Sequence, residues 1–198
     1  MDRFRAIPAD QPLAVLWESR WSDLASSNGF EHLLVQPSYA NGVIAGFDDA
    51  RRPFRIQYEI EWDGNWCTRE VEIDIVAAGQ AHSFHLSADE HARWFDGGGH
   101  EIAQLTGCRD VDIWPTPFTN TLAMRRLQLG VDERAEIDVA YIDAIAGELT
   151  SRRQAYTALP NGDYRFESLE SGFAADLVVD DYGLVIDYPG LFARRGAK

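Results

Sequence analysis

The sequence is poor in cysteine. Its 198 residues include two cysteines, Cys67 and Cys108, which are far apart and form no CxxC pair. This number and spacing exclude a dense disulfide framework and a zinc site built on cysteine. We expect both thiols to be reduced and buried. Nothing else in the spacing of His, Cys, Asp and Glu predicts a cofactor, so we expect none.

Basic residues are also few. The chain has 18 Lys and Arg against 32 Asp and Glu, which gives a formal net charge of −14 at pH 7. A surface this acidic repels the phosphates of nucleic acids and of anionic bilayers. We therefore expect no nucleic-acid partner and no binding to anionic membrane surfaces. A neutral or cationic small ligand is compatible with the charge.

Long apolar runs are absent. No stretch approaches the roughly 20 apolar residues that a membrane-spanning helix needs. The N-terminal stretch 1–17 is interrupted by Pro8, Asp10, Gln11 and Pro12, so it lacks the continuous apolar core of a signal peptide. We expect no transmembrane segment and a cytoplasmic location.

What remains is the composition of an ordinary globular protein. Apolar residues make up 45% of the chain and charged residues 25%. The length is sufficient for a core that needs neither disulfides nor metals. Because no low-complexity linker or internal repeat divides the chain, we predict a single domain over residues 1–198.

The clearest pattern is the alternation of apolar and polar residues, which is typical of strands with one buried face. In Phe54–Trp62 every second residue is apolar, and the residues between are Arg, Gln or Glu. After the turn-like Asp63-Gly64-Asn65, the alternation resumes in Cys67–Ile75. The two segments are predicted to form a long hairpin with one dry face and one wet face.

The same alternation predicts further strands. They lie at 30–36, 42–47, 81–87, 92–95, 135–142, 152–159, 163–169, 173–179 and 184–188. Asn161-Gly162, between two of these segments, is a strong hairpin signal. A sheet of this many strands must curl, split or close. The sequence therefore predicts a mainly β protein with a highly curved antiparallel sheet that forms a barrel or half-barrel.

Helix is scarce in the predicted fold. The best candidate is a short helix at 119–129, with Thr119 or Asn120 as its N-cap. It follows a Pro-Thr-Pro motif that cannot itself be helical. Weaker helical signals lie at Leu13–Trp17 and at Asp89–His91.

One stretch can identify a family. Asp110–Arg126, with the sequence DVDIWPTPFTNTLAMRR, joins a strand to a rigid turn and an amphipathic helix. It resembles the central block of the bacterial putative glycolipid-binding family. Other segments resemble the same family in order, namely NGFEHLL (28–34), AEIDVAYI (135–142), YRFESLESGFAAD (164–176) and GLVIDYPGLF (183–192). The resemblance covers about residues 14–194.

The resemblance implies both a fold and a function. The fold would be similar to that of bacterial lipoprotein carriers of the outer-membrane sorting system, in which helices plug the apolar concave side of a curved antiparallel sheet. The function would be non-enzymatic binding of a glycolipid or another amphipathic small molecule in this concavity. Two alternatives stay open. One is a structural or interaction protein with a fully packed core, and the other is a small-molecule enzyme.

Eight residues are candidates for contacts with a ligand. They are Glu31, His32, Trp62, Trp114, Thr116, Phe118, Asn120 and Arg126. Polar groups would hold a headgroup, and aromatic rings would stack on sugar or acyl groups. Each residue type also has a structural explanation. Aromatic side chains fill β cores, Thr116 and Asn120 suit a turn and a helix cap, and a buried Glu or His is normally paired.

An enzyme would require a convergent set of titratable side chains. The candidates are Glu31, His32, Asp110 and Asp112, which would have to meet within hydrogen-bond reach of one another. Asp110 and Asp112 share one strand face. We favour ion pairs with the arginines at 109, 125 or 126 as their explanation, because half-buried charges need partners. We therefore predict no catalytic residue.

Two further groups of polar residues have ordinary explanations. His82 and His85 form an HxxH pair, but spacing of three along a strand places them on opposite faces. We favour surface or hydrogen-bonded histidines over a metal pair. Glu70, Glu72 and Asp74 alternate with apolar residues, which predicts a solvated outer face.

Overall fold

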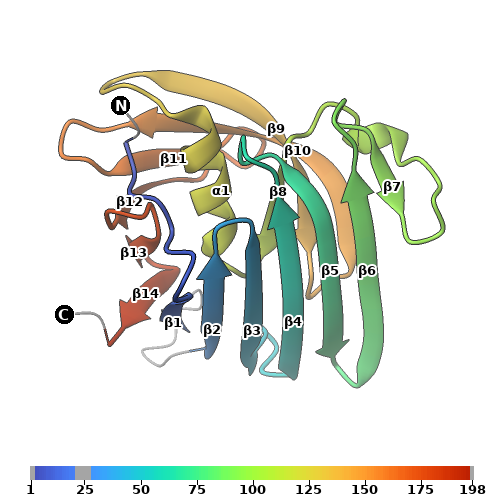
Figure 1. The fold of residues 1–198 in the computed structure, drawn as a ribbon. Coiled ribbons are helices and arrows are strands. Elements are labelled where there is room, and N and C mark those ends of the chain that lie inside the picture. Colours follow the sequence, from blue (N-terminus) through green and yellow to red (C-terminus); the bar gives the residue numbers. More distant parts are fainter. Residues whose placement is uncertain (1–2, 21–27, 197–198) are drawn as a thin grey trace.

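The computed structural model describes residues 3–20 and 28–196, which form one strongly curved sheet with a helix against it (Figure 1). The strands in this part of the chain are β1 (Leu13–Ser19), β2 (Gly29–Gln36), β3 (Tyr39–Phe47), β4 (Pro53–Trp62), β5 (Thr68–Ala77), β6 (Gln80–Ala88), β7 (Trp94–Asp96), β8 (Asp110–Trp114), β9 (Arg134–Asp143), β10 (Glu148–Ala158), β11 (Tyr164–Ser168), β12 (Ala174–Val179), β13 (Val185–Tyr188) and β14 (Phe192–Arg195). A 3₁₀ turn, η1 (Ala103–Leu105), and the helix α1 (Phe118–Leu127) complete the described elements. The predicted mainly β fold with a short helix is confirmed.

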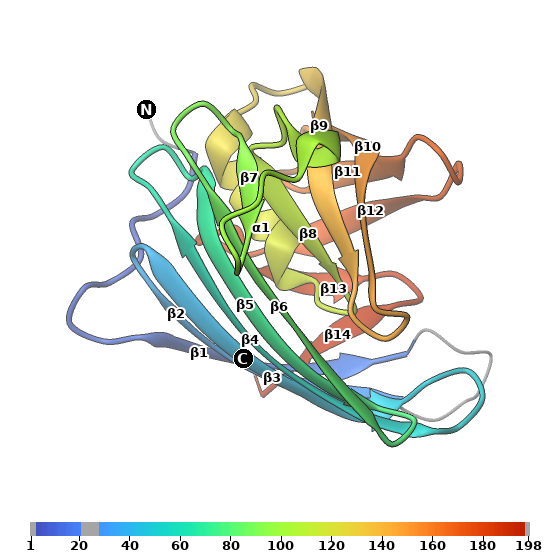
Figure 2. The same ribbon diagram turned by 90° about the vertical axis from the view of Figure 1, so that its right-hand side faces the viewer.

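Neighbours in the chain are neighbours in the sheet almost throughout. The order is β7-β6-β5-β4-β3-β2-β1-β14-β13-β12-β11-β10-β9-β8, so β7 and β8 are the two edges and the barrel does not close. The pair β8 and β9 is parallel, because α1 carries the chain back between them, and the other pairs are antiparallel. The result is the half-barrel seen from its side in Figure 2.

The predicted long hairpin is formed by β4 and β5. Most apolar residues of both strands are buried and most residues between them are exposed, as the alternation predicted. The register shifts between Glu61 and Trp62, close to the turn. In the turn, Oδ1 of Asp63 accepts the backbone N–H groups of Asn65 (2.8 Å) and Cys67 (3.0 Å). One aspartate therefore closes the connection between the strands.

The predicted helix at Leu13–Trp17 is wrong, because this segment lies in β1. The strand pairs with β2 on one side and β14 on the other. Trp17 is fully buried, and its Nε1 donates to the carbonyl of Val185 at 2.8 Å. Two strand partners and a buried indole outweigh a weak local preference for helix. The signal at Asp89–His91 also fails, since residues 90 and 91 form a turn.

Helix α1 lies inside the curve of the sheet (Figures 1 and 2). Residues 118–125 are all buried, so the helix has no solvent-facing side along this length. Phe118 and Leu122 pack into the apolar cluster that includes the concave residues of β2–β5. Met124 packs into a second cluster, with Tyr156 of β10. The helix therefore connects two parts of the core.

The ends of α1 differ from the prediction. The helix begins at Phe118 without a side-chain cap, so a cap by Thr119 or Asn120 is wrong. Both residues lie in the first turn, where their side chains bond to β8 and to the preceding turn. The helix ends at Leu127, and Gln128 follows in the left-handed conformation with a φ of 50°. Within the described ranges, no helix is long and apolar enough to cross a membrane.

Both cysteines are free and buried, as predicted. Cys67 follows the turn of the β4–β5 hairpin, and Cys108 precedes β8. Burial raises the pKa of both thiols. The thiolate is the reactive form of cysteine, so this shift disfavours reaction of either thiol at neutral pH.

Candidate ligand-binding site

A cavity of about 300 Å³ lies beside α1, among strands β8–β11 and the C-terminal strands. We call it cavity 1. Its lining combines polar and aromatic side chains that are far apart in the sequence. The lining residues are Asp112, Ile113, Trp114, Thr116, Asn120, Tyr141, Arg152, Gln154, Phe166, Ser168, Ser171, Phe173, Tyr188, Leu191 and Phe192. The volume is at the lower end of the range for small-molecule sites.

Strand pairing brings the polar lining residues together. The parallel pair β8–β9 places Asp112 opposite Tyr141. The antiparallel pair β10–β11 places Gln154 opposite Ser168. Asn120 reaches the same cavity from the first turn of α1. The βαβ connection and the neighbouring strands therefore contribute to one site.

Asp112 is at the centre of a hydrogen-bond network in this cavity. Its Oδ1 accepts the hydroxyl of Thr119 at 3.0 Å, and its Oδ2 accepts the side-chain amide of Gln154. The hydroxyl of Tyr156 donates to Oδ1 of Asn120 at 2.9 Å. Burial raises the pKa of Asp112, and the bonds from Gln154 and Thr119 oppose this rise. The network holds a carboxyl and two amides in fixed orientations beside the cavity.

Aromatic rings form much of the remaining lining. Phe192 meets both Trp114 and Tyr188 edge to face, with ring centroids 6.0 Å and 5.9 Å apart. Phe173 lies 6.2 Å from Tyr188 and is 40% exposed, so it forms a rim between the cavity and solvent. Aromatic rings beside a few oriented polar groups are the usual composition of a small-molecule site.

Glu31 lies behind one residue of this lining. Its Oε1 accepts the hydroxyls of Tyr58 (2.5 Å) and Thr116 (2.8 Å), and Thr116 lines cavity 1. Its Oε2 has no hydrogen-bond partner among the described residues. Burial raises the pKa of Glu31 to about 8, against the lowering effect of the two hydroxyl bonds. At neutral pH the carboxyl is therefore mostly protonated, which avoids an uncompensated buried charge.

Residues 18–194 match the model of a protein family described as "Putative glycolipid-binding". This chain belongs to that family. It is also similar to a DUF1089 family protein from Pseudomonas aeruginosa, known from a crystal structure at 1.80 Å resolution. The two sequences are 42% identical, the alignment covers 88% of this chain and 97% of the other, and the TM-score is 0.82. No curated protein matches the sequence.

The eight predicted ligand contacts are spread over different surroundings in this chain. Trp114, Thr116 and Asn120 line cavity 1. Trp62 and Phe118 belong instead to the apolar core, where their ring centroids lie 6.0 Å apart. Their aromatic character serves packing of the β core rather than the lining of this cavity.

The four residues of the enzyme alternative make separate contacts. Glu31 and His32 lie on opposite faces of β2, with Glu31 buried and His32 exposed. Asp110 is buried and forms an ion pair with Arg126, with 2.6 Å between Oδ2 and Nη2. The ion pair predicted for Asp110 is thus present, whereas Asp112 bonds to an amide and a hydroxyl. Arg126 lines a different cavity from cavity 1.

Most of the concave face of the sheet is filled by side chains. The fully buried residues of β2–β5 include Leu33, Ile44, Ile56, Tyr58, Ile60 and Val71. They pack in one cluster with Phe118 and Leu122 of α1. This part of the molecule agrees with the packed-core alternative. Space for a ligand is left beside it, in cavity 1.

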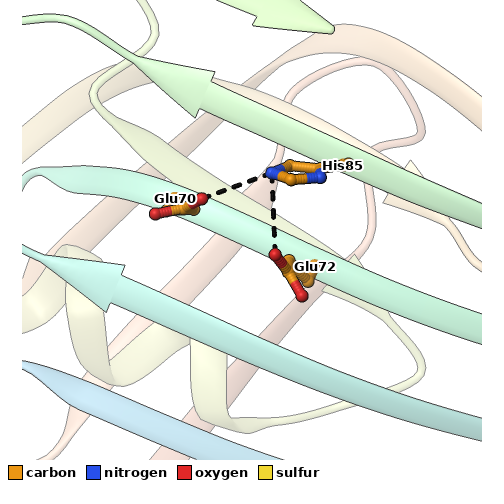
Figure 3. Close-up of side chains that lie close together, drawn as sticks. All are labelled: Glu70, Glu72 and His85. Atoms are coloured by element: carbon orange, nitrogen blue, oxygen red, sulfur yellow. Dashed lines mark hydrogen bonds and ion pairs between the residues drawn. The ribbon is translucent and has the colours of Figure 1, made fainter. Parts of the chain in front are cut away.

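A cluster of candidate metal ligands lies on the outer face of β5 and β6 (Figure 3). Nε2 of His85 is 3.3 Å from Oε1 of Glu70 and 3.6 Å from Oε1 of Glu72. The three ligand atoms lie within 4.8 Å of one another. The side chains are 54%, 44% and 55% exposed, so contacts between histidine and carboxylates on a solvated face explain the arrangement. His82 faces the other way and contacts the carbonyl of Ala144.

Sequence patterns do not predict most of the lining of cavity 1. Tyr141, Arg152 and the aromatic residues of β11–β14 alternate like residues of any half-buried strand. Their meeting depends on strand register over long separations. One signal is present in β10, where the polar Gln154 is buried next to Ala155 and Tyr156. A buried amide in such a strand indicates a polar partner, which here is Asp112.

Proposed function

We propose that this protein binds a glycolipid, or a closely similar amphipathic molecule, without transforming it. The observation that carries this proposal is the lining of cavity 1, where Asp112, Asn120 and Gln154 lie beside the rings of Trp114 and Tyr188. Membership of the glycolipid-binding family supports a binding function independently. The sugar would lie in the cavity, and the acyl chain would leave it along the aromatic rim.

The polar groups of cavity 1 suit the hydroxyls of a sugar. A carboxylate accepts hydrogen bonds, and the amides of Asn120 and Gln154 both donate and accept them. Thr119 and Tyr156 already hold these side chains in place. Binding therefore costs little side-chain entropy.

The apolar part of the ligand has a surface to contact at the rim. Phe173, Leu191 and Phe192 line this part of the cavity, and Phe173 is 40% exposed. Each methylene buried there would contribute roughly 0.8 kcal/mol before ordering costs. A cavity of about 300 Å³ has room for a headgroup and the first part of a chain, so the remainder would extend over the surface.

Binding without catalysis fits the state of the carboxyl groups near the cavity. Glu31 is covered by Thr116, and Asp110 is neutralised by Arg126. Both oxygens of Asp112 accept bonds from uncharged groups. In the described ranges none of these three carboxyls bonds to a histidine or to another carboxyl, as an acid–base pair would.

Soluble alkyl glucosides test this function. They should raise the melting temperature of the purified protein more than glucose or the matching alcohol does, because only the glucoside uses both parts of the lining. Native mass spectrometry should show the bound probe, and extraction should return it with unchanged mass. A product of altered mass would contradict non-enzymatic binding. A protein that no glycolipid or alkyl glucoside stabilises or binds would refute the proposal.

Two variants separate cavity 1 from the general surface. Phe173→Ala should weaken the binding of alkyl glucosides, because it removes the ring at the rim. Phe47→Ala is the matched control, since Phe47 is 42% exposed on β3 and outside the cavity. Equal affinities of the two variants for alkyl glucosides would contradict the proposal that the acyl chain leaves cavity 1 along Phe173.

A further inference from the structure

A second cavity, of about 660 Å³, lies between the N-terminal segment, the β4–β5 turn and the C-terminal end of α1. We call it cavity 2. Its lining residues are Phe4, Ala6, Ile7, Pro37, Gly64, Asn65, Trp66, Cys67, Arg109, Arg125, Arg126 and Gln128. It shares no lining residue with cavity 1. Among the described residues, three arginines and no carboxylate line this cavity, which opens to solvent.

We propose that cavity 2 is an anion site that takes the phosphate group of an organic phosphate ester. The charge of its lining is opposite to that of the molecule, whose net charge is −14. The cluster of positive charges is the feature that distinguishes this cavity from the rest of an acidic surface. In a cavity with low-dielectric walls such a cluster produces a focused positive potential.

Two of the arginines are held in fixed positions. Arg126 donates through Nε and Nη2 to the buried carboxylate of Asp110, at 2.9 Å and 2.6 Å, while Nη1 takes no part in this pair. The guanidinium of Arg125 lies 4.1 Å from the ring centroid of Trp66 and donates to the carbonyls of Arg5 and Tyr182. These contacts set both side chains in place before a ligand arrives.

The third arginine, Arg109, is exposed. It lies directly before β8, where its carbonyl accepts the N–H of Thr68. Among the described residues it forms no ion pair within 4.0 Å. With Asp110 paired to Arg126, the charge of Arg109 is left for an anion that enters the cavity.

Phosphate fits this arrangement better than a carboxylate. A phosphate monoester carries more negative charge and offers three oxygens, which suits several guanidinium forks at once. The cavity is also larger than a phosphate group requires, at about 660 Å³. Ala6, Ile7 and Pro37 provide an apolar wall for the organic part of the ester. The phosphate could belong to a soluble ester or to a lipid headgroup, and the chemistry of recognition is the same.

The test is a calorimetric titration of the full chain with three probes, which are glycerol phosphate, inorganic phosphate and glycerol. We expect glycerol phosphate to bind, glycerol not to bind, and the affinity to fall with added salt. Arg109→Glu should weaken the affinity by roughly tenfold or more. Arg55→Glu is the matched control. It makes the same change of charge at an exposed position of β4. Arg55 and Trp62 lie near opposite ends of this strand, and the ring of Trp62 stacks on Trp66, which lines cavity 2.

Co-sedimentation with phosphatidylcholine vesicles, with and without phosphatidic acid, distinguishes the two sources. Binding to glycerol phosphate without binding to vesicles assigns cavity 2 to soluble esters. Binding to phosphatidic acid vesicles that Arg109→Glu abolishes assigns it to a lipid headgroup. Equal affinities for Arg109→Glu and Arg55→Glu, or no binding of any phosphate probe, would overturn the proposal. None of these outcomes depends on whether an alkyl glucoside binds in cavity 1.

Discussion

Replacement of Glu31 by glutamine should make the stability of this protein less dependent on pH. Glu31 is buried, and its pKa of about 8 lies far above its ordinary value of 4.5. Glutamine has nearly the same shape and cannot ionise. Its carbonyl can accept the same bonds from Tyr58 and Thr116, and its amide would occupy the place of Oε2, which has no partner among the described residues. The substitution therefore removes the ionisation, and any cost of burying the amide N–H groups there does not depend on pH.

The sign and size of the effect follow from the two pKa values. Between pH 4.5 and about 8 the folded protein keeps a proton on Glu31 that the unfolded chain has released. The free energy of unfolding of the wild type therefore falls as pH rises through this window. One pH unit corresponds to about 1.4 kcal/mol, so the interval from 4.5 to about 8 corresponds to a loss on the order of 5 kcal/mol.

Urea unfolding at a series of pH values measures this effect. The free energy of unfolding of Glu31→Gln minus that of the wild type should rise by a few kcal/mol between about pH 5 and about pH 8, and then level off. Other titrating groups are common to both proteins and largely cancel in the difference. Urea is uncharged, so it leaves electrostatic interactions unscreened.

Glu61→Gln is the control for the loss of a negative charge. Glu61 is exposed on the outer face of β4, so its replacement leaves the buried carboxyl intact. The difference between this variant and the wild type should stay nearly constant over the same range. If the Glu31→Gln difference were equally constant, the conclusion that Glu31 is a buried, protonated carboxyl would be refuted.

Three further substitutions, one of them a control, test the packing of the core. Gly42→Ala should lower the free energy of unfolding by about 1–3 kcal/mol or more, since its Cβ would overlap the buried ring of Tyr58. Gly64→Ala should have little effect in the same urea experiment, because nothing lies within 4 Å of its Cβ position. Phe118→Ala should cost about 3–5 kcal/mol, since Phe118 is fully buried in the core. It should leave the affinity for alkyl glucosides unchanged, and weaker binding at unchanged stability would contradict its place in the core.

The strands of the central hairpin were predictable because their signal is local. Side chains of a strand alternate between faces, so the face of each residue in β4 and β5 depends only on its position along the strand. The same argument fails at β1. Residues 13–17 are all apolar, so the sequence shows no alternation there, although the burial in the strand does alternate. The strands β2 and β14, which hold β1 in the sheet, are distant from each other in the sequence. A local pattern cannot show such partners.

The helix shows the same division. The Pro-Thr-Pro motif before it correctly predicted where helix could begin, because proline lacks the N–H and fixes the backbone. The side of the helix that is buried was not predictable, since sheet surrounds it and residues 118–125 are all buried. Thr119 resembles a cap in the sequence, yet its hydroxyl bonds to Asp112 on a strand that returns beside the helix.

The sequence by itself determined the class of fold, the family and the acidic character of this protein, because alternation, motif order and composition are properties of the chain alone. Only the tertiary structure decided which side chains fill the core and which meet a cavity. Glu31 and Thr116 are 85 residues apart, and Asp112 and Gln154 are 42 apart, yet each pair is hydrogen-bonded. Trp62 lies in the apolar core, whereas Trp114 lines cavity 1. The difference arises because the position of a cavity depends on how elements that are distant in the sequence pack against one another.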